Sequence, residues 1–381
     1  MNRQILSHAT LILPGETVEG SVVIEDGKIA EVLPGQTFEA GTNLHGRYLA
    51  PGVIDIHTDY LERELNPRPD THFPLELAFH MMDVRAISCG ITTVLGAVRV
   101  SEENDGPLGS WRGNGLLLAE AYQNLRQSAR ARHYLHVRWD PNFEPCDESL
   151  ARLLELRSSI GNLVYNDSTP GERQYKNTYS DQIRRYALTK QISVIEAEAE
   201  FAEKRAKSLQ TNNRAKVNAA FGRHLPLGSH DDTTVEHVIE AFEHGATLAE
   251  MPVTIEAARK ARELGMQICM GAPNYYRGGS HCGNLSAHHA LAEGLVDVLC
   301  SDYHFPCLLG SAVKMIHAGA APHTAMNLIT RNAARHLQLD AELGSIETGK
   351  AADLIAFRAE PSFGDVTHAW VNGQLKFAGV A

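Results

Sequence analysis

The sequence predicts an α/β protein: a (β/α)₈ TIM barrel with a small composite β-domain built from both ends of the chain. Two observations support this fold class. The middle of the chain alternates short apolar runs with helical stretches, as parallel βαβ units do. The two ends instead resemble hairpin strands. An open doubly wound sheet is the main alternative, but no glycine-rich fingerprint follows the first apolar run.

Eight apolar runs have the length and bounds of buried strands. Helical patterns separate most of them, for example over residues 114–132 and 253–265. Parallel strands joined by helices close naturally into a barrel when eight such units follow one another. The expected strands are Val53–His57, Ile91–Val98, Tyr134–Arg138, Asn162–Asn166, Leu225–His230, Thr247–Glu250, Gln267–Gly271 and Val296–Ser301.

Both ends of the chain carry hairpin turns between alternating apolar residues. Asp26-Gly27 lies in "SVVIEDGKIAEVLPG", and Asn372-Gly373 lies in "VTHAWVNGQLKF". Both dipeptides favour the two-residue turns of β-hairpins. We therefore expect a β-domain of residues 1–50 with 345–381, and a (β/α)₈ barrel over residues 51–344.

One connection is too long for a simple barrel loop. Residues at about 168–224 contain a helical stretch, "DQIRRYALTKQISVIEAEAEFAEKRAKSLQ". Insertions of this size are usually lids or binding elements. The other interpretation is a solvated helical hairpin that only decorates the barrel, and the sequence does not decide between the two.

The composition excludes several classes of function. The 381-residue chain has a net charge of -11, so it does not predict a nucleic-acid surface. No run approaches the roughly 18 uninterrupted apolar residues of a membrane span. The six cysteines are scattered without a CxxC pair, which favours a reducing, cytoplasmic location.

Acidic and imidazole side chains follow five of the eight predicted strands. The carboxyl ends of barrel strands meet on one face, where active sites are built. Each residue alone also suits a helix cap, as Asp231 and Asp232 do before Thr234. Grouped in a dry pocket, however, these carboxylates would repel one another unless one or two divalent ions (Zn, Mn or Fe) bound them. The candidate metal ligands are His57, Asp59, Asp167, His230, Glu250 and Asp302.

A glycine-rich segment after the seventh strand suggests a phosphate site. In "NYYRGGSHCGNLSA", residues 274–287, the glycines allow the backbone to approach a ligand, and Arg277 offers a planar fork of donors. Barrels often bind phosphate in the loops after strands seven and eight. The alternative is a flexible turn with an exposed arginine. The candidate phosphate or substrate contacts are Arg68, Arg138, Arg173, Arg277, Ser280, His281 and Asn284.

The chain resembles the amidohydrolase superfamily in "PGVIDIH", "GSIETGKAADLIAF" and "VTHAWVNGQ". The resemblance implies a metal-dependent barrel with a β-domain from both termini. Three positions depart from the common family pattern. Asp59 replaces the second histidine of His-x-His, and Glu250 replaces a histidine. On the fourth strand Asn166-Asp167 replaces a lysine that often bridges two metals, which makes Asp167 the substitute bridge.

A narrower resemblance, to the PhnM family of phosphonate utilisation, rests on eight segments that include "IDIHTDYLE", "DSTPGERQY", "SHDDTT" and "MGAPNYYRGGSHCGN". It implies hydrolysis of α-D-ribose 1-methylphosphonate 5-triphosphate to the 5-phosphate and diphosphate. We expect Asp302 to orient the attacking water and accept its proton. The expected partner is a small phosphorylated sugar, with no nucleic acid or membrane, and homo-oligomerisation is left open. The alternatives are a hydrolase of C–N bonds (a cyclic-amide hydrolase or deacetylase) and a non-enzymatic scaffold.

Overall fold

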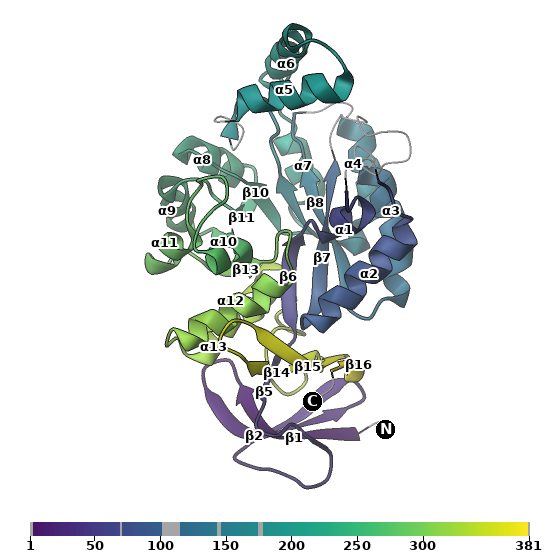
Figure 1. The fold of residues 1–381 in the computed structure, drawn as a ribbon, viewed down its shortest axis with the longest axis vertical. Helices are drawn as coiled ribbons and strands as arrows, with labels where there is room; N and C mark the ends of the chain where they lie inside the picture. Colours follow the sequence, from purple (N-terminus) through teal and green to yellow (C-terminus); the bar gives the residue numbers. More distant parts are fainter. Residues whose placement is uncertain (1–2, 69–70, 101–114, 143–145, 174–177, 380–381) are drawn as a thin grey trace.

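The computed structural model describes residues 3–68, 71–100, 115–142, 146–173 and 178–379. Its central element is an eight-stranded parallel sheet in which each strand pairs with the next along the chain (Figure 1). The predicted barrel is confirmed, and each predicted run overlaps one strand with ends that differ by at most two residues. The strands are β6 (Val53–Thr58), β7 (Ile91–Val100), β8 (Arg132–Trp139), β9 (Ile160–Tyr165), β10 (Leu227–His230), β11 (Ala246–Glu250), β12 (Gln267–Gly271) and β13 (Val298–Cys300).

The barrel closes between its first and last strands. Thr58, the last residue of β6, forms a parallel bridge with Asp302, just beyond β13. Lower in the barrel, buried Asp55 accepts a hydrogen bond from the backbone N–H of Ser301, at 2.9 Å. Both links join segments that are more than 240 residues apart in sequence. The closure therefore brings the ends of β6 and β13 side by side.

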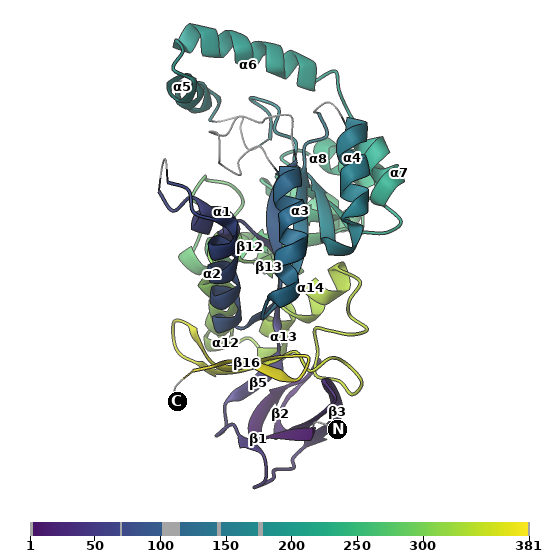
Figure 2. The same cartoon turned by 90° about the vertical axis from the view of Figure 1, so that its right-hand side faces the viewer.

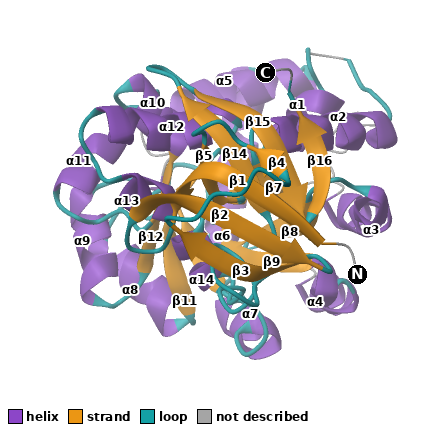
Figure 3. Cartoon of the chain, turned by 90° about the horizontal axis from the view of Figure 1, so that it is seen from below, coloured by secondary structure: helices purple, strands orange, loops and turns teal. Residues whose placement is uncertain are grey.

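Helices surround the strands, as the view from below shows (Figure 3). Large apolar side chains of strands and helices form one main core, while a smaller cluster fills the barrel interior. Thr234 caps the helix after β10, so Asp231 and Asp232 are not its caps. The surrounding helices are α1 (Tyr60–Leu65), α2 (Leu75–Ser88), α3 (Gly115–Leu125), α4 (Cys146–Glu155), α7 (Arg214–Phe221), α8 (Val235–Glu243), α9 (Ile255–Glu263), α10 (Ala272–Arg277), α11 (Ala287–Ala292), α12 (Pro306–His317), α13 (Pro322–Asn327) and α14 (Arg331–His336).

A second, mixed sheet is built from both ends of the chain. The predicted turns are present, since Asp26 and Asn372 have φ of 49° and each is followed by a glycine with positive φ. The two ends meet where β5 pairs antiparallel with β14, immediately before β5 leads into the barrel. The strands are β1 (Arg3–Ile12), β2 (Thr17–Glu25), β3 (Lys28–Pro34), β4 (Thr42–Asn43), β5 (Tyr48–Pro51), β14 (Leu354–Ala359), β15 (Gly364–Val371) and β16 (Gln374–Ala378).

The long connection after β9 contains a helical hairpin of α5 (Tyr179–Lys190) and α6 (Val194–Ser208). Ser193 and Glu196 form a capping box that fixes the start of α6. The hairpin has its own small apolar core, which includes Ile183 and Phe201. Figures 1 and 2 place it at the end of the molecule opposite the mixed sheet. Within the described ranges, no helix has the length and apolar character that a membrane span needs.

Candidate active site and metal centre

Barrel closure assembles the first group of candidate metal ligands. The backbone N–H of Asp302 donates to the carbonyl of His57 (3.1 Å), and that of Asp59 donates to the carbonyl of Asp302 (2.6 Å). His57 Nε2 lies 3.5 Å from Asp59 Oδ1. One ligand atom from each of the three residues lies within 4.8 Å of the others, which is close enough to share an ion.

A second group lies deeper and shares His57. The Nδ1 atom of His57 lies 3.1 Å from Glu250 Oε1, and His230 Nε2 lies 3.7 Å from Glu250 Oε2. All three side chains are buried, and Glu250 is fully so. Their ligand atoms also lie within 4.8 Å of one another. Two adjoining groups of candidate metal ligands thus share His57, and they come from β6, β10, β11 and the segments after β6 and β13.

The donor atoms of this site fit a bound cation. Both ring nitrogens of His57 and His230 and both carboxylate oxygens of Glu250 are buried without a hydrogen bond from the described residues. A buried carboxylate without such bonds is costly, and a divalent ion would satisfy it together with the imidazole nitrogens. The residues present therefore suit the metal that the fold implies.

The charges in the site are strongly coupled. Burial opposes the charge of Glu250, but the imidazoles of His136 and His57 outweigh it and hold the pKa of Glu250 well below its usual range. Burial likewise opposes the charge of His57, but Glu250 and Asp59 raise its pKa. For Asp302, burial and the nearby Asp59 carboxylate raise the pKa. Among Asp59, Glu250 and Asp302, Asp302 alone has a raised pKa.

His136, on β8, is a site residue that the sequence analysis missed. Its ring stacks on that of His57, with centroids 4.3 Å apart, and its Nε2 lies 3.3 Å from Glu250 Oε2. His136 lies two residues before Arg138 on one strand, and side chains at that spacing share a face. Because Arg138 was predicted to point into the site, the same alternation could have identified His136.

A pocket of about 290 Å³ opens above these ligands. In this pocket Arg138 forms an ion pair with Asp59, with 3.3 Å between Arg138 Nη1 and Asp59 Oδ2. Tyr303, which was not predicted, lies 3.5 Å from Arg277 through its hydroxyl. Arg68 is exposed and does not line the pocket. The predicted residues that do line it are Asp59, Arg138, His230, Arg277, Ser280, His281, Asn284 and Asp302.

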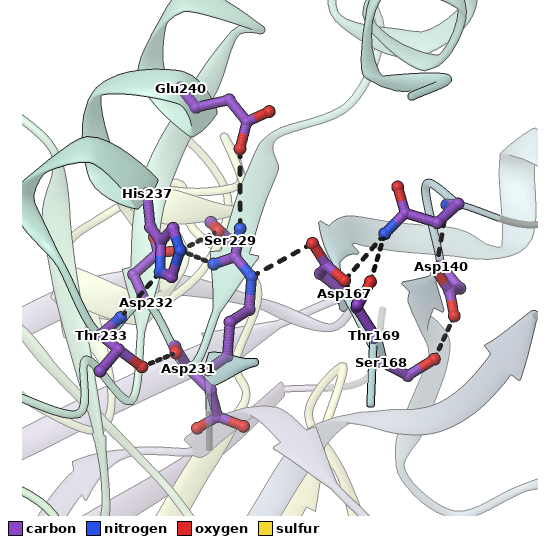
Figure 4. Close-up of polar contacts among 12 residues, drawn as sticks. Asp140, Asp167, Ser168, Thr169, Ser229, Asp231, Asp232, Thr233, His237 and Glu240 are labelled. Carbon is purple, nitrogen blue, oxygen red and sulfur yellow. Dashed lines mark hydrogen bonds and ion pairs between the residues drawn. The ribbon is translucent and has the colours of Figure 1, made fainter. Parts of the chain in front are cut away.

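Contrary to the expectation from sequence, Asp167 and Arg173 do not face the metal ligands. Asp167 accepts a hydrogen bond from Asn142 (2.8 Å) and pairs with Arg173 (3.4 Å) and Arg214 (3.2 Å). Arg173 is buried and is surrounded by carboxylates rather than open to a phosphate. Figure 4 shows Asp167 and Asp232 on opposite sides of this network. The arginines neutralise Asp167, so it is not available as a bridging ligand.

Comparison with known proteins identifies the family of this chain. The amidohydrolase family model matches residues 48–376. The chain belongs to the amidohydrolase family. It is 32% identical, over 98% of its length and 100% of the relative, to the α-D-ribose 1-methylphosphonate 5-triphosphate diphosphatase of Escherichia coli K12.

Solved structures confirm the fold over nearly the whole chain. The N-acetylglucosamine-6-phosphate deacetylase of Pasteurella multocida matches with a TM-score of 0.62 at 13% identity, covering 99% of this chain and 100% of that one. A Xaa-Pro dipeptidase with bound methionine matches with a TM-score of 0.63 at 15% identity, covering 99% and 100%. At these identities the likeness concerns the fold alone.

Proposed function

We propose that the protein is a metal-dependent diphosphatase that cleaves a ribosyl 5-triphosphate, α-D-ribose 1-methylphosphonate 5-triphosphate, to the 5-phosphate and diphosphate. The observation that carries this proposal is that Asp59, His230 and Asp302, members of the two metal-ligand groups, line the same pocket as Arg277 and its glycine-rich loop. The E. coli relative named for this substrate supports the choice of bond.

Five residues would hold one or two divalent ions of Zn, Mn or Fe. Carboxylates and imidazoles suit all three metals. A divalent ion held by these residues would lower the pKa of a water molecule and so make hydroxide available near neutral pH. The proposed ligands are His57, Asp59, His230, Glu250 and Asp302.

The side chains of the pocket divide the remaining work. Asp302, whose pKa is raised, accepts the proton from the attacking water. Arg277 neutralises the charge that the departing diphosphate develops, and Ser280, His281 and Asn284 add donors or acceptors along the same loop. Arg138 is held by Asp59 beside the metal ligands, where it faces the phosphate nearest the attack.

Replacing Arg277 tests the phosphate assignment. In Arg277→Ala we expect kcat/KM for diphosphate release to fall about 10- to 100-fold, because a charged contact to the triphosphate is lost. The matched control is Arg184→Ala, an exposed arginine on α5, which should leave turnover unchanged. Release of diphosphate from ribosyl and nucleoside 5-triphosphates is measured by a coupled assay at saturating Mn²⁺ or Zn²⁺.

Three outcomes would overturn the proposed function. Unchanged turnover in Arg277→Ala would exclude the phosphate contact. Cleavage of cyclic amides or N-acetyl sugars without diphosphate release would favour the C–N hydrolase instead. A metal-free, well-folded protein that added metal does not stabilise would indicate a scaffold.

Three further assignments belong to this proposal. The six free cysteines suit the reducing environment of the cytoplasm. Residues 1–50 with 345–381 act as a β-domain that supports the barrel of residues 51–344. The substrate is a small phosphorylated sugar, and the protein works as a single chain or as a homo-oligomer.

A further inference from the structure

Arg173 lies at the base of the helical insertion, where it is buried among carboxylates. Its guanidinium forms an ion pair with Asp232, which follows β10, and lies 3.4 Å from Asp167, which follows β9. It also reaches Glu240 of α8, at 3.8 Å. The backbone of Arg173 has a φ of 48°, a left-handed conformation that is uncommon outside glycine. The surrounding contacts must hold this conformation.

A second buried arginine shows which carboxylate of this network depends on Arg173. Arg214, on α7, pairs with Asp167 at 3.2 Å and with Glu240 at 3.4 Å. These two carboxylates therefore have two arginines each. Within the described part of the chain, Asp232 pairs with Arg173 alone among the arginines. Loss of Arg173 would leave only Asp232 without a cationic partner.

Asp232 in turn fixes the turn that follows His230. Ser229 donates its hydroxyl to Asp232 Oδ1 at 2.9 Å, and the Val253 N–H donates to the Asp232 carbonyl at 2.9 Å. Asp231, which lies between His230 and Asp232, has a backbone φ of 60°. As a result His230 and Asp231 line the pocket, whereas Asp232 points into the arginine network (Figure 4).

The turn also sets how His230 presents its ring. Asp231 Oδ2 lies 2.7 Å from His230 Nδ1, a close contact between the two side chains that is not aligned as a hydrogen bond, and His230 Nε2 lies 3.7 Å from Glu250 Oε2. A carboxylate beside one ring nitrogen fixes the orientation of an imidazole whose other nitrogen binds a metal. We infer that Arg173 is a positioning residue for the metal centre, acting through Asp232 on His230, and is not a phosphate contact. This inference rests on the proposed metal site.

Metal affinity without substrate is the decisive measurement. Zn²⁺ is titrated against a chromogenic chelator in the full-length wild type, in Arg173→Gln and in Arg214→Gln. We expect Arg173→Gln to weaken binding about 10- to 100-fold, as loss of other partners of metal ligands does. Arg214→Gln is the matched control, because this arginine is equally buried in the same network but does not contact Asp232. It should change metal affinity less than threefold.

A double-variant cycle provides the second test. Asp232→Asn should weaken metal binding as Arg173→Gln does, and the double variant should be no worse than either single one, because neither partner is then buried alone. At saturating metal the KM of Arg173→Gln for the triphosphate should stay at the wild-type value. If Arg173→Gln does not fold, Asp232→Asn carries the same expectation for metal affinity.

Several results would contradict the inference. Equal weakening in Arg173→Gln and Arg214→Gln would show a general loss of the network. Unchanged metal affinity with a raised KM at saturating metal would make Arg173 a substrate contact. A wild type that binds metal but releases no diphosphate would refute the proposed reaction and leave the role of Arg173 standing, whereas a wild type that binds no metal would refute both.

Discussion

Two clusters of buried and half-buried carboxylates lie at the same end of the barrel, and their counter-charges differ. The imidazole cluster consists of His57, Asp59, His230, Glu250 and Asp302. The arginine cluster consists of Asp167, Arg173, Arg214, Asp232 and Glu240. In the arginine cluster the chain supplies the cations itself. In the imidazole cluster, buried Glu250 has only imidazole nitrogens as its ion-pair partners among the described residues. The comparison teaches that a candidate metal site is distinguished by the kind of partner its carboxylates have, and not by their number.

The largest expected effect comes from breaking the imidazole cluster at Glu250. In Glu250→Gln the carboxylate that forms a ligand group with both His57 and His230 is lost, so we expect diphosphate release to fall at least about 100-fold. The measurement is metal content after gel filtration together with turnover. The protein should remain folded, since a neutral amide of similar volume replaces a buried charge. Full metal content in this variant would remove Glu250 from the site.

Removing the metal should have the next largest effect. Binding at 100 times Kd stabilises a folded protein by about 2.7 kcal/mol, so a chelator should lower the free energy of unfolding by about that amount. Urea denaturation with and without a chelator measures it. Glu250→Gln is the control, because a variant without the site should not respond. A wild type that is equally stable in both conditions would argue against a filled imidazole cluster.

The arginine cluster should respond to acid instead. Burial opposes the charge of Asp167, but Arg173 and Arg214 outweigh it and lower its pKa to about 2. A lowered pKa stabilises the fold at a pH above the ordinary value near 4, and this contribution of about 2 kcal/mol is lost as pH falls toward 2. Denaturation between pH 6 and pH 2.5 should therefore show a shallower loss of stability in Asp167→Asn than in the wild type. Identical slopes would mean that the arginines do not hold this carboxylate.

The barrel could be predicted because its strands are apolar runs with regular spacing. The same logic identified the residues at the ends of β6, β10, β11 and the segment after β13, since strand ends converge on one face. Asp167 and Arg173 were misplaced for a physical reason. Which carboxylate meets an arginine depends on Arg214, on a helix that lies more than 40 residues beyond Asp167. No spacing rule connects such positions before the chain is folded.

His136 was missed for a different reason. His136 lies inside β8 and not at its end, so the search for polar side chains at strand ends did not find it, although its Nε2 lies 3.3 Å from Glu250 Oε2. To find His136, one has to follow the alternation of inward-facing side chains on β8 from Arg138 to the residue two positions earlier. Tyr303 was missed because its role depends on the position of Arg277, which a separate loop sets.

The closure of the barrel between Thr58 and Asp302 has a consequence for the newly made chain. The first candidate ligand is synthesised early, but its partner on the last strand follows more than 240 residues later. The strand that leads into β6 is β5. It pairs with β14, which is synthesised later still. A nascent chain on the ribosome therefore cannot complete the group of His57, Asp59 and Asp302 until β13 has been made, whereas the residues of the group with His230 and Glu250 are all present earlier.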